Sequence, residues 1–285
     1  MRVLIVGCGY VGLPLGSALA GLGHEVHGLR RGTNTHAAME ESGIIPHAVD
    51  ITQREQLDNL PGPFDWIINT VSSGRGGANA YHGIFVVGTQ NLIDWFTSSP
   101  PQKYLFTSST GVYGQTDGSW VDEDSPTEPS GDTGQILLEA ESLALSIGGV
   151  ILRLSGIYGP ERGHLYRQFL KGEAVMTGNP DRWMNMIHRD DVTGCIMAAM
   201  KTADPGTVLN ATDNEPATQQ DFFQWLADQL DRPLPPQESE VMPHKRAQTN
   251  KRVANSRARE MLSWTPKYPT WRKGYAKLME SEGVL

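Results

Sequence analysis

The chain has 285 residues, of which 39% are hydrophobic and 20% are charged, a composition typical of an ordinary globular protein. No apolar run approaches the roughly 20 residues that a membrane-spanning helix needs. Glycines stop the apolar run in MRVLIVGCG, so we interpret this opening as a strand and not as a signal peptide. The net charge of −8 argues against a nucleic-acid partner. We therefore expect a protein that binds a small molecule, and neither nucleic acid nor a membrane.

The cysteines and histidines indicate no covalent or metal framework. Cys8 and Cys195 are too few for a disulfide framework, so a reducing, cytoplasmic setting is expected. The histidines do not stand at metal-ligand spacing from Cys, Asp or Glu, so no metal site is predicted. The basic segment 244–259, HKRAQTNKRVANSRAR, is interpreted either as a solvated helix face with its loop or as an anion contact for a phosphorylated substrate.

Short β-branched runs alternate with helical patterns through the first two-thirds of the chain, which is typical of a parallel sheet covered on both faces. Between the first two runs, Leu15, Leu19 and Leu22 recur at helical spacing. We predict an α/β fold with a doubly wound parallel sheet. The predicted strands are RVLIVG (2–7), HEVHGLR (24–30), DWIINTV (65–71), KYLFTSS (103–109) and VILRLSGIYG (150–159).

The C-terminal third contains one strong helical pattern, ATQQDFFQWLADQL at 217–230. Thr218 is the predicted N-cap, because its side chain can accept a hydrogen bond from an N–H of the first turn. Phe222, Phe223, Leu226 and Leu230 then share one face. The proline-rich segment 232–237 ends this pattern, so we expect a smaller C-terminal lobe.

Gly7, Gly9 and Gly12 form a G-x-G-x-x-G motif between the first predicted strand and the first predicted helix. In that context Gly7 permits a tight turn, Gly9 lets a pyrophosphate approach the backbone, and Gly12 lets the helix pack closely. The N–H groups at the helix start favour an anion. The motif, with Tyr10 and Val11 inside it, predicts a Rossmann-type dinucleotide site.

The end of the second strand bears on which dinucleotide binds. NAD-binding versions of this motif carry an acid about 20 residues on, which holds the ribose 2′-hydroxyl. Here VHGLRR supplies Arg30 and Arg31 instead, and a guanidinium binds a 2′-phosphate that a carboxylate would repel. NADP is therefore favoured over NAD. The alternative is that Arg30 and Arg31 are two exposed arginines at a strand end that do not contact the cofactor. Asp50, after the third strand, is either an adenine contact or a turn residue.

Ordered motifs along nearly the whole chain resemble an extended short-chain dehydrogenase/reductase of the NAD-dependent epimerase/dehydratase family. They are VGCGYVG, VDIT, VVGTQNLI, FTSSTGVYGQ, VDEDSPTEPSG, LRLSGIYGP, NMIHRDDV and NKRVANSRAREMLSWTPKYPTW. The resemblance implies an NADP-binding Rossmann domain at 1–160, with 186–203 returning to it, and a small C-terminal α+β substrate lobe formed mainly by 161–285. Family members act mostly on nucleotide sugars or small carbonyl compounds, and they often form homodimers through the helices that include 130–147.

The resemblance also assigns roles to residues at the matching positions. Ser109 matches the family's active-site Ser/Thr. The family's Tyr-x-x-x-Lys pair would fall on Thr133 and Leu137, which still share a helix face. The matching cofactor contacts beyond the glycine motif are Arg30, Asp50, Ile51, Thr70, Val71, Ser72, Ser155, Gly156 and Ile157.

The replacement of the Tyr-Lys pair leaves the source of a proton open. A Thr hydroxyl is too weak an acid to replace a phenol of pKa about 10, and Leu137 supplies no charge. Other candidate donors are Tyr113, Tyr158 and His188, each of which has a structural role as its alternative. No other Tyr-x-x-x-Lys occurs in the chain, so a misaligned conventional epimerase is the least favoured interpretation.

Two hypotheses about function stay open. In the first, the protein is an NADP-dependent oxidoreductase or isomerase that acts on a small carbonyl or sugar-nucleotide-like substrate with a non-standard proton donor. Its catalytic candidates are Ser109, Thr133 and Tyr113. In the second, it is a non-catalytic NADP(H)-binding sensor or scaffold, for which a retained cofactor loop and a missing acid are expected.

Overall fold

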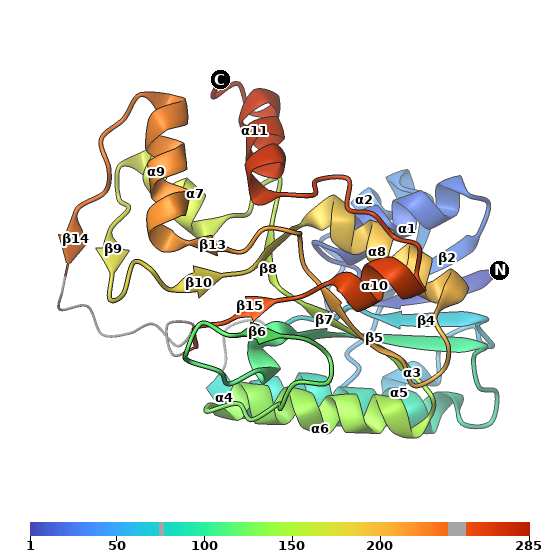
Figure 1. The fold of residues 1–285 in the computed structure, drawn as a ribbon. Helices are drawn as coiled ribbons and strands as arrows, with labels where there is room; N and C mark the ends of the chain where they lie inside the picture. The colour runs from blue at the N-terminus through green and yellow to red at the C-terminus, as the bar shows by residue number, and fades with distance from the viewer. Residues whose placement is uncertain (74–76, 239–248) are drawn as a thin grey trace.

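The computed structural model describes residues 1–73, 77–238 and 249–285. Seven strands form its central sheet in the order β12-β7-β5-β4-β1-β2-β3, and every neighbouring pair in it is parallel (Figure 1). The predicted doubly wound α/β fold is confirmed. The strands are β1 (Arg2–Val6), β2 (Glu25–Arg30), β3 (Ile44–Ala48), β4 (Trp66–Asn69), β5 (Lys103–Ser109), β7 (Val150–Leu154) and β12 (Val208–Ala211).

The order of the strands defines where a ligand can bind. The chain starts at β1, adds β2 and β3 on one side, and then returns to add β4, β5, β7 and β12 on the other. This reversal between β1 and β4 is the topological switch point, where the carboxyl ends of the strands leave a crevice in open α/β sheets.

Helices cover both faces of the sheet, so β1, β4 and β7 are buried along almost their whole length. On one face lie α1 (Gly12–Gly21), α2 (His36–Glu41), α8 (Arg189–Thr202) and α10 (Ser256–Met261). On the other lie α3 (Arg54–Leu57), the π-helical turn η1 (Gly83–Val87), α5 (Gly88–Phe96) and α6 (Asp132–Ser146). The helix α4 (Gly77–His82) precedes η1, and η2 (Thr110–Val112) follows β5. The free thiols of Cys8 and Cys195 are buried in the first of these two cores.

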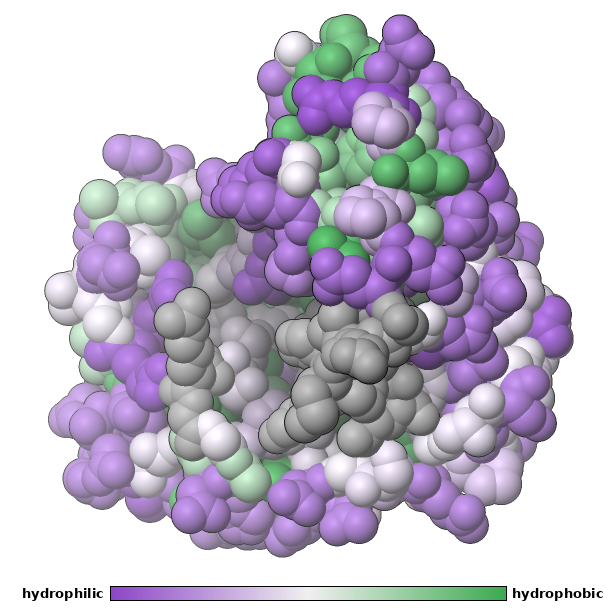
Figure 2. All heavy atoms as spheres, turned by 90° about the vertical axis from the view of Figure 1, so that its left-hand side faces the viewer, coloured by the Kyte–Doolittle hydropathy of each residue, from purple (hydrophilic) through white to green (hydrophobic). Residues whose placement is uncertain are grey.

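A third core, rich in aromatic side chains, forms the upper lobe of Figure 1. Thr218 caps α9 by accepting the backbone N–H of Asp221, so the predicted N-cap is confirmed. The surface is hollowed beneath this lobe (Figure 2). The lobe contains β8 (Gly156–Tyr158), α7 (His164–Lys171), β9 (Met176–Thr177), β10 (Trp183–Met184), β11 (Met186–His188), β13 (Ala217–Thr218), α9 (Gln219–Leu230), β14 (Gln237–Glu238) and α11 (Trp271–Ser281).

The chain crosses several times between the part that contains the sheet and the lobe. Some of these crossings lie within 204–285, which the sequence predicts to belong mainly to the lobe. After α8 the chain also supplies β12 to the sheet, and Ala258, Leu262 and Trp264 later pack in the first core. Between these, β15 (Arg252–Val253) pairs with β6 (Trp120–Val121). The predicted strand 150–159 is interrupted at Ser155, where the chain leaves the sheet for the lobe. No helix within the described residues is long and apolar enough to cross a membrane.

Candidate functional site

The candidate residues converge because they follow the carboxyl ends of neighbouring parallel strands. Val6 is in register with Leu29 of β2 and with Asn69 of β4. The residues that follow, Gly7, Arg30 and Thr70, therefore lie side by side at this edge. Ser109 at the end of β5 is in register with Leu154 at the end of β7. Ser155 directly follows Leu154, so Ser109 and Ser155 lie at the same edge.

The first glycine of the motif is required by the backbone. Gly7 has φ +84°, and a Cβ there would lie 2.7 Å from the Cα of Val71. The N–H groups of Gly7 and Cys8 both donate to the carbonyl of Leu29, at 3.2 and 2.9 Å. A Cβ on Gly12 would lie 2.8 Å from the Gly7 carbonyl, so the loop and α1 pack too closely for a side chain.

Gly9 differs from both, because its missing side chain leaves open space. Among the described residues the nearest atom to a Cβ on Gly9 is the Gly7 carbonyl oxygen, at 3.8 Å. Tyr10 and Val11 lead from Gly9 into α1, and within the described chain no side chain caps that helix. Uncapped N–H groups and open space over a glycine are what a pyrophosphate needs, so the loop fits a dinucleotide.

Arg30 and Arg31 stand at the end of β2, next to this loop. Arg30 is half-buried and Arg31 is exposed. Neither guanidinium pairs with a carboxylate among residues 1–73, 77–238 and 249–285. Two unpaired cations beside the glycine loop fit an additional phosphate on the dinucleotide.

Asp50 has a local structural role. Its Oδ1 accepts from the backbone N–H and the hydroxyl of Thr52, at 3.0 and 2.8 Å, which is the geometry of a turn. Ile51 is buried, and its carbonyl accepts from the side-chain amide of Asn91. The turn uses only Oδ1 of Asp50. A contact between Oδ2 and the adenine remains a hypothesis.

The segment after β4 closes the other side of the glycine loop. The Thr70 hydroxyl donates to the carbonyls of Val6 and Gly7, at 3.2 and 3.1 Å. The backbone N–H of Val71 donates to Asn69 Oδ1 at 3.3 Å, and Ser72 is exposed. These bonds fix the strand end against the loop.

Polar hydroxyls gather where β5 and β7 end. Ser109 Oγ accepts from the N–H of Gly111 at 3.1 Å, which leaves its own proton available to a substrate oxygen. The hydroxyls of Ser108 and Ser155 are buried without a hydrogen-bond partner in the part of the chain that the structure describes. Ile157, two residues after Ser155 in β8, is half-buried. Buried, unpaired hydroxyls are uncommon and suit a site that a ligand completes.

Thr133 and Leu137 both lie on α6, in very different surroundings. Thr133 is exposed in the first turn, whereas Leu137 is only 3% exposed and packs in the second core with Ala140 and Ala144. The position that resembles the family's lysine is therefore filled by apolar packing.

Tyr113, a predicted catalytic candidate, lies in the core. Its side chain is fully buried, its hydroxyl accepts from Arg153 Nη1 at 3.0 Å, and it donates to Asn210 Oδ1 at 2.9 Å. Burial raises the pKa of this phenol. These contacts give Tyr113 a structural role, and its catalytic role remains a prediction.

Tyr158 and His188 also have structural roles. The Tyr158 ring stacks on Tyr275 with centroids 4.2 Å apart, inside the lobe core. His188 Nδ1 accepts from the N–H of Asp190 at 3.1 Å and so caps α8. Burial lowers the pKa of His188 to about 4, so the imidazole is neutral at pH 7 and has no proton to give as an imidazolium.

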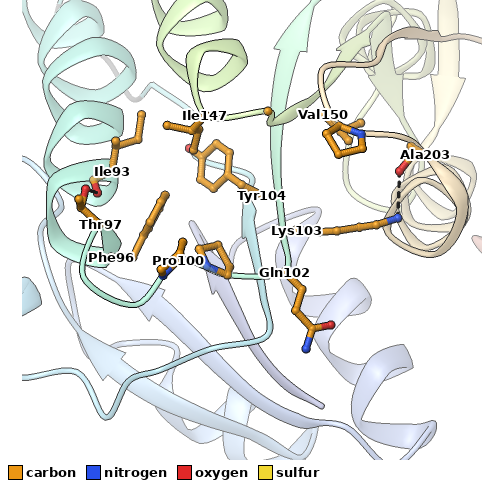
Figure 3. A pocket seen from close by; sticks show the side chains of 13 residues that line it. Ile93, Phe96, Thr97, Pro100, Gln102, Lys103, Tyr104, Ile147, Val150 and Ala203 are labelled. Carbon is orange, nitrogen blue, oxygen red and sulfur yellow. Dashed lines mark hydrogen bonds between the residues drawn. The ribbon is translucent and has the colours of Figure 1, made fainter.

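A pocket lies at the amino ends of the strands, away from the residues of this site. It has a volume of about 260 Å³ and opens where β5 and β7 begin, between Phe96, Tyr104 and Ile147 (Figure 3). Lys103 crosses its margin and donates to the carbonyl of Ala203 at 2.9 Å.

Sequence reasoning missed Lys251 as an individual residue. It belongs to the basic segment 244–259, whose first part, 244–248, lies outside the described residues. Within the rest, Arg252 lies over the rings of Trp120 and Trp183, and Arg257 pairs with Asp124. Lys251 is instead buried. The one signal in the sequence is that Lys251 stands two residues before Val253. Alternate residues of an extended segment lie on the same face, so both would face inward.

The fold and the glycine loop define a class of α/β proteins that bind nicotinamide dinucleotides. The model of the NAD dependent epimerase/dehydratase family matches residues 3–211, and the chain belongs to this family. It is 30% identical over 217 residues to protein YeeZ of Escherichia coli K12, covering 73% of this chain and 76% of that protein.

Solved structures share the whole fold. One from Methylobacillus flagellatus is 32% identical, with a TM-score of 0.80, and covers 99% of this chain and 98% of its own. The UDP-glucuronic acid 4-epimerase of Bacillus cereus in complex with NAD is 20% identical, with a TM-score of 0.80 and coverage of 98% and 97%. The second similarity establishes the fold alone.

Proposed function

We propose that the protein is an NADP(H)-dependent oxidoreductase or isomerase that acts on a small carbonyl or sugar-nucleotide-like substrate. The observation that carries this proposal is the pair of guanidiniums, Arg30 and Arg31, that have no carboxylate partner among the described residues and stand at the end of the strand next to the open space over Gly9. When bound, a nicotinamide dinucleotide supplies or accepts a hydride. The glycine loop and the start of α1 would hold its pyrophosphate, and the two arginines its 2′-phosphate.

Ser109 is the residue proposed to orient the substrate oxygen. Its hydroxyl proton is available because Oγ already accepts from Gly111. Thr133 is exposed and Leu137 is apolar, so neither of these two residues supplies a buried acid. General acid–base catalysis contributes about 10²–10⁴-fold, so turnover can persist through proximity alone, with the proton taken from water.

The second candidate function, a non-catalytic NADP(H) sensor, is favoured by one observation. Leu137, inside α6, packs in the second core at the position where a charged relay would have to stand. A sensor also requires that the two redox forms of the cofactor bind two conformations with different affinity.

The test is to follow NADPH oxidation with a panel of aldehydes, ketones and keto-sugar nucleotides. The proposal expects substrate-dependent oxidation that falls about 10²- to 10³-fold in Ser109→Ala and is unchanged in the exposed control Ser99→Ala. Absence of turnover, together with different protease sensitivity of the NADP⁺ and NADPH complexes, would establish the sensor instead.

A further inference from the structure

Two histidines on neighbouring strands share a hydrogen bond near the edge of the sheet. Nδ1 of His27 in β2 lies 2.8 Å from Nε2 of His47 in β3, and the two rings stack with centroids 5.1 Å apart. His27 is only 3% exposed, and its ring packs edge to face with Phe64. A hydrogen bond needs one donor and one acceptor, so one of the two facing nitrogens must lack a proton. The pair can therefore hold one extra proton but not two.

A carboxylate and a guanidinium extend this pair into a chain across three strands. His27 Nε2 donates to Glu25 Oε1 at 2.8 Å, and Arg2 Nε of β1 donates to the same oxygen at 2.9 Å. The hydrogen bonds from His27 and Arg2 lower the pKa of the Glu25 carboxyl, so it stays negative in mild acid. Side chains of β1, β2 and β3 are thus joined through polar contacts from Arg2 to His47.

A third histidine lies near the pair. His36 begins α2, which contacts β3, and its Nε2 is buried without a partner in the described chain. Burial, together with the charges of His27 and His36, lowers the pKa of His47. Among the described residues, the charged and titratable groups around the pair are therefore Arg2, Glu25 and His36. The Glu25 carboxylate balances one extra proton, whereas a second would turn both facing nitrogens into donors and place two like charges together.

The two strands that the pair joins lead to the residues assigned to the adenosine part of a dinucleotide. β2 ends at Arg30, and Asp50 follows β3 by two residues. Between them, the N–H of Val49 donates to the Arg30 carbonyl at 2.9 Å. β3 is the edge strand of the sheet and pairs with β2. The contact between these two strands therefore sets where Asp50 stands relative to Arg30.

We propose that Glu25, His27 and His47 form an acid-sensitive latch, which holds β3 against β2 and is released when the histidine pair takes up a second proton. The release is a local opening of β3, which separates Asp50 from Arg30 and so disrupts the dinucleotide site. This last step rests on the proposed function, whereas the latch itself does not.

The sign and size of the effect follow from the proton count. The closed latch holds one extra proton, and the opened strand leaves each histidine free to take up its own. A free histidine has a pKa of about 6.5, so opening gains about tenfold between pH 7.5 and pH 5.5. The stabilisation is fully present above this value and is lost as the pH falls, which agrees with the lowered pKa of His47.

The experiment measures amide hydrogen exchange of the full-length protein without dinucleotide at pH 7.5 and pH 5.5. Protection factors are compared, because they remove the pH dependence of the exchange chemistry itself. In wild type the protection of β3 should fall about tenfold more than that of the central strand β1, since a global change in stability acts on both strands. Equal changes in the two strands of wild type would show that there is no latch, and this comparison needs no variant.

Two variants sharpen the comparison. His47→Gln keeps an amide that can donate to His27 Nδ1 but takes up no proton, so the difference between β3 and β1 should disappear. The exposed control His164→Gln should behave as wild type does. A difference that persists unchanged in His47→Gln would contradict the role of this histidine.

The link to the dinucleotide is read from the same exchange measurement at pH 5.5 with NADP⁺ at about 100 times its Kd. If opening of β3 prevents binding, the protection of β3 should rise by about 100-fold. Bound NADP⁺ that leaves this protection unchanged would show that the latch does not control the site. If calorimetry detects no binding of NADP⁺, the proposed function fails, and the measurements without dinucleotide still decide whether the latch exists.

Discussion

Arg153 of β7 and Glu141 of α6 form a buried, bidentate ion pair, with Nη2 2.7 Å from Oε2 and Nε 3.1 Å from Oε1. Arg153 also donates to the hydroxyl of Tyr113, which in turn donates to Asn210. The pair fixes the helix that carries Thr133 to β7, the neighbour of the edge strand β12. It also turns Tyr113 into a structural residue.

Breaking this pair should be costly. Glu141→Gln leaves the Arg153 guanidinium buried without a counter-charge, so we expect a loss of about 3–5 kcal/mol in the free energy of unfolding. The control Glu139→Gln changes an exposed carboxylate on the same helix and should stay within about 0.5 kcal/mol. Urea denaturation measures both, and a loss below about 1 kcal/mol in Glu141→Gln would contradict this role.

The space over Gly9 can be filled without disturbing the fold. In Gly9→Ala the added methyl group meets nothing closer than 3.8 Å among the described residues, so the Tm should hardly change. The methyl group occupies the approach of the pyrophosphate, and we expect about a tenfold or larger loss of NADPH affinity by fluorescence titration. Gly21→Ala, at the open end of α1, is the matched control for both readouts. Unchanged NADPH affinity in Gly9→Ala would show that the loop does not hold a pyrophosphate.

The two substitutions that restore the family's Tyr-x-x-x-Lys pair, Thr133→Tyr and Leu137→Lys, should change the free energy of unfolding by different amounts. Thr133→Tyr adds a side chain at an exposed position and should change stability by about 0.5 kcal/mol or less. Leu137→Lys places an ammonium in the second core and should cost about 2–5 kcal/mol. Leu137→Met is the control of similar volume, with an expected loss below about 1.5 kcal/mol. Thermal unfolding separates these cases, and a fully stable Leu137→Lys would mean that α6 is not packed as described.

Asp213 should make stability depend on pH. It is buried, and burial raises its pKa from an ordinary value near 4 to about 9. The folded state therefore holds a proton that the unfolded state lacks between about pH 4 and pH 9. The stabilisation is fully present below this window and is lost as the pH rises through about 9.

Asp213→Asn removes that dependence. We expect its Tm to vary less than that of wild type between pH 5 and pH 9, and to exceed wild type at pH 9. Asp191, whose pKa burial raises to about 6, contributes a smaller dependence between about pH 4 and pH 6 in both proteins. The exposed control Asp228→Asn should follow wild type. If the Tm of Asp213→Asn and that of wild type change with pH in parallel, the raised pKa of Asp213 is contradicted.

The sequence predicts those features that depend on residues close together in the chain. The glycine loop between β1 and α1 and the Thr218 cap of α9 are local patterns, and the structure contains both. The parallel sheet follows equally from the alternation of strands and helices.

Features that depend on distant residues were beyond the sequence. Tyr113 stands in a motif that resembles an active site, but its partners Arg153 and Asn210 are 40 and 97 residues away. The burial of Lys251 depends on Asn185, 66 residues before it. Tertiary contacts of this kind decide whether a polar side chain faces a ligand or the core, and a local pattern contains no information about them.

The most direct test of the account measures dinucleotide affinity by calorimetry on freshly purified protein. Since the two guanidiniums of Arg30 and Arg31 are unpaired in the described chain, NADPH should bind about 10- to 100-fold more tightly than NADH. Arg30→Ala should lose most of that difference by weakening NADPH alone, and the exposed control Arg259→Ala should keep it. Equal affinity for NADPH and NADH in wild type, or no binding of either, would contradict the central claim.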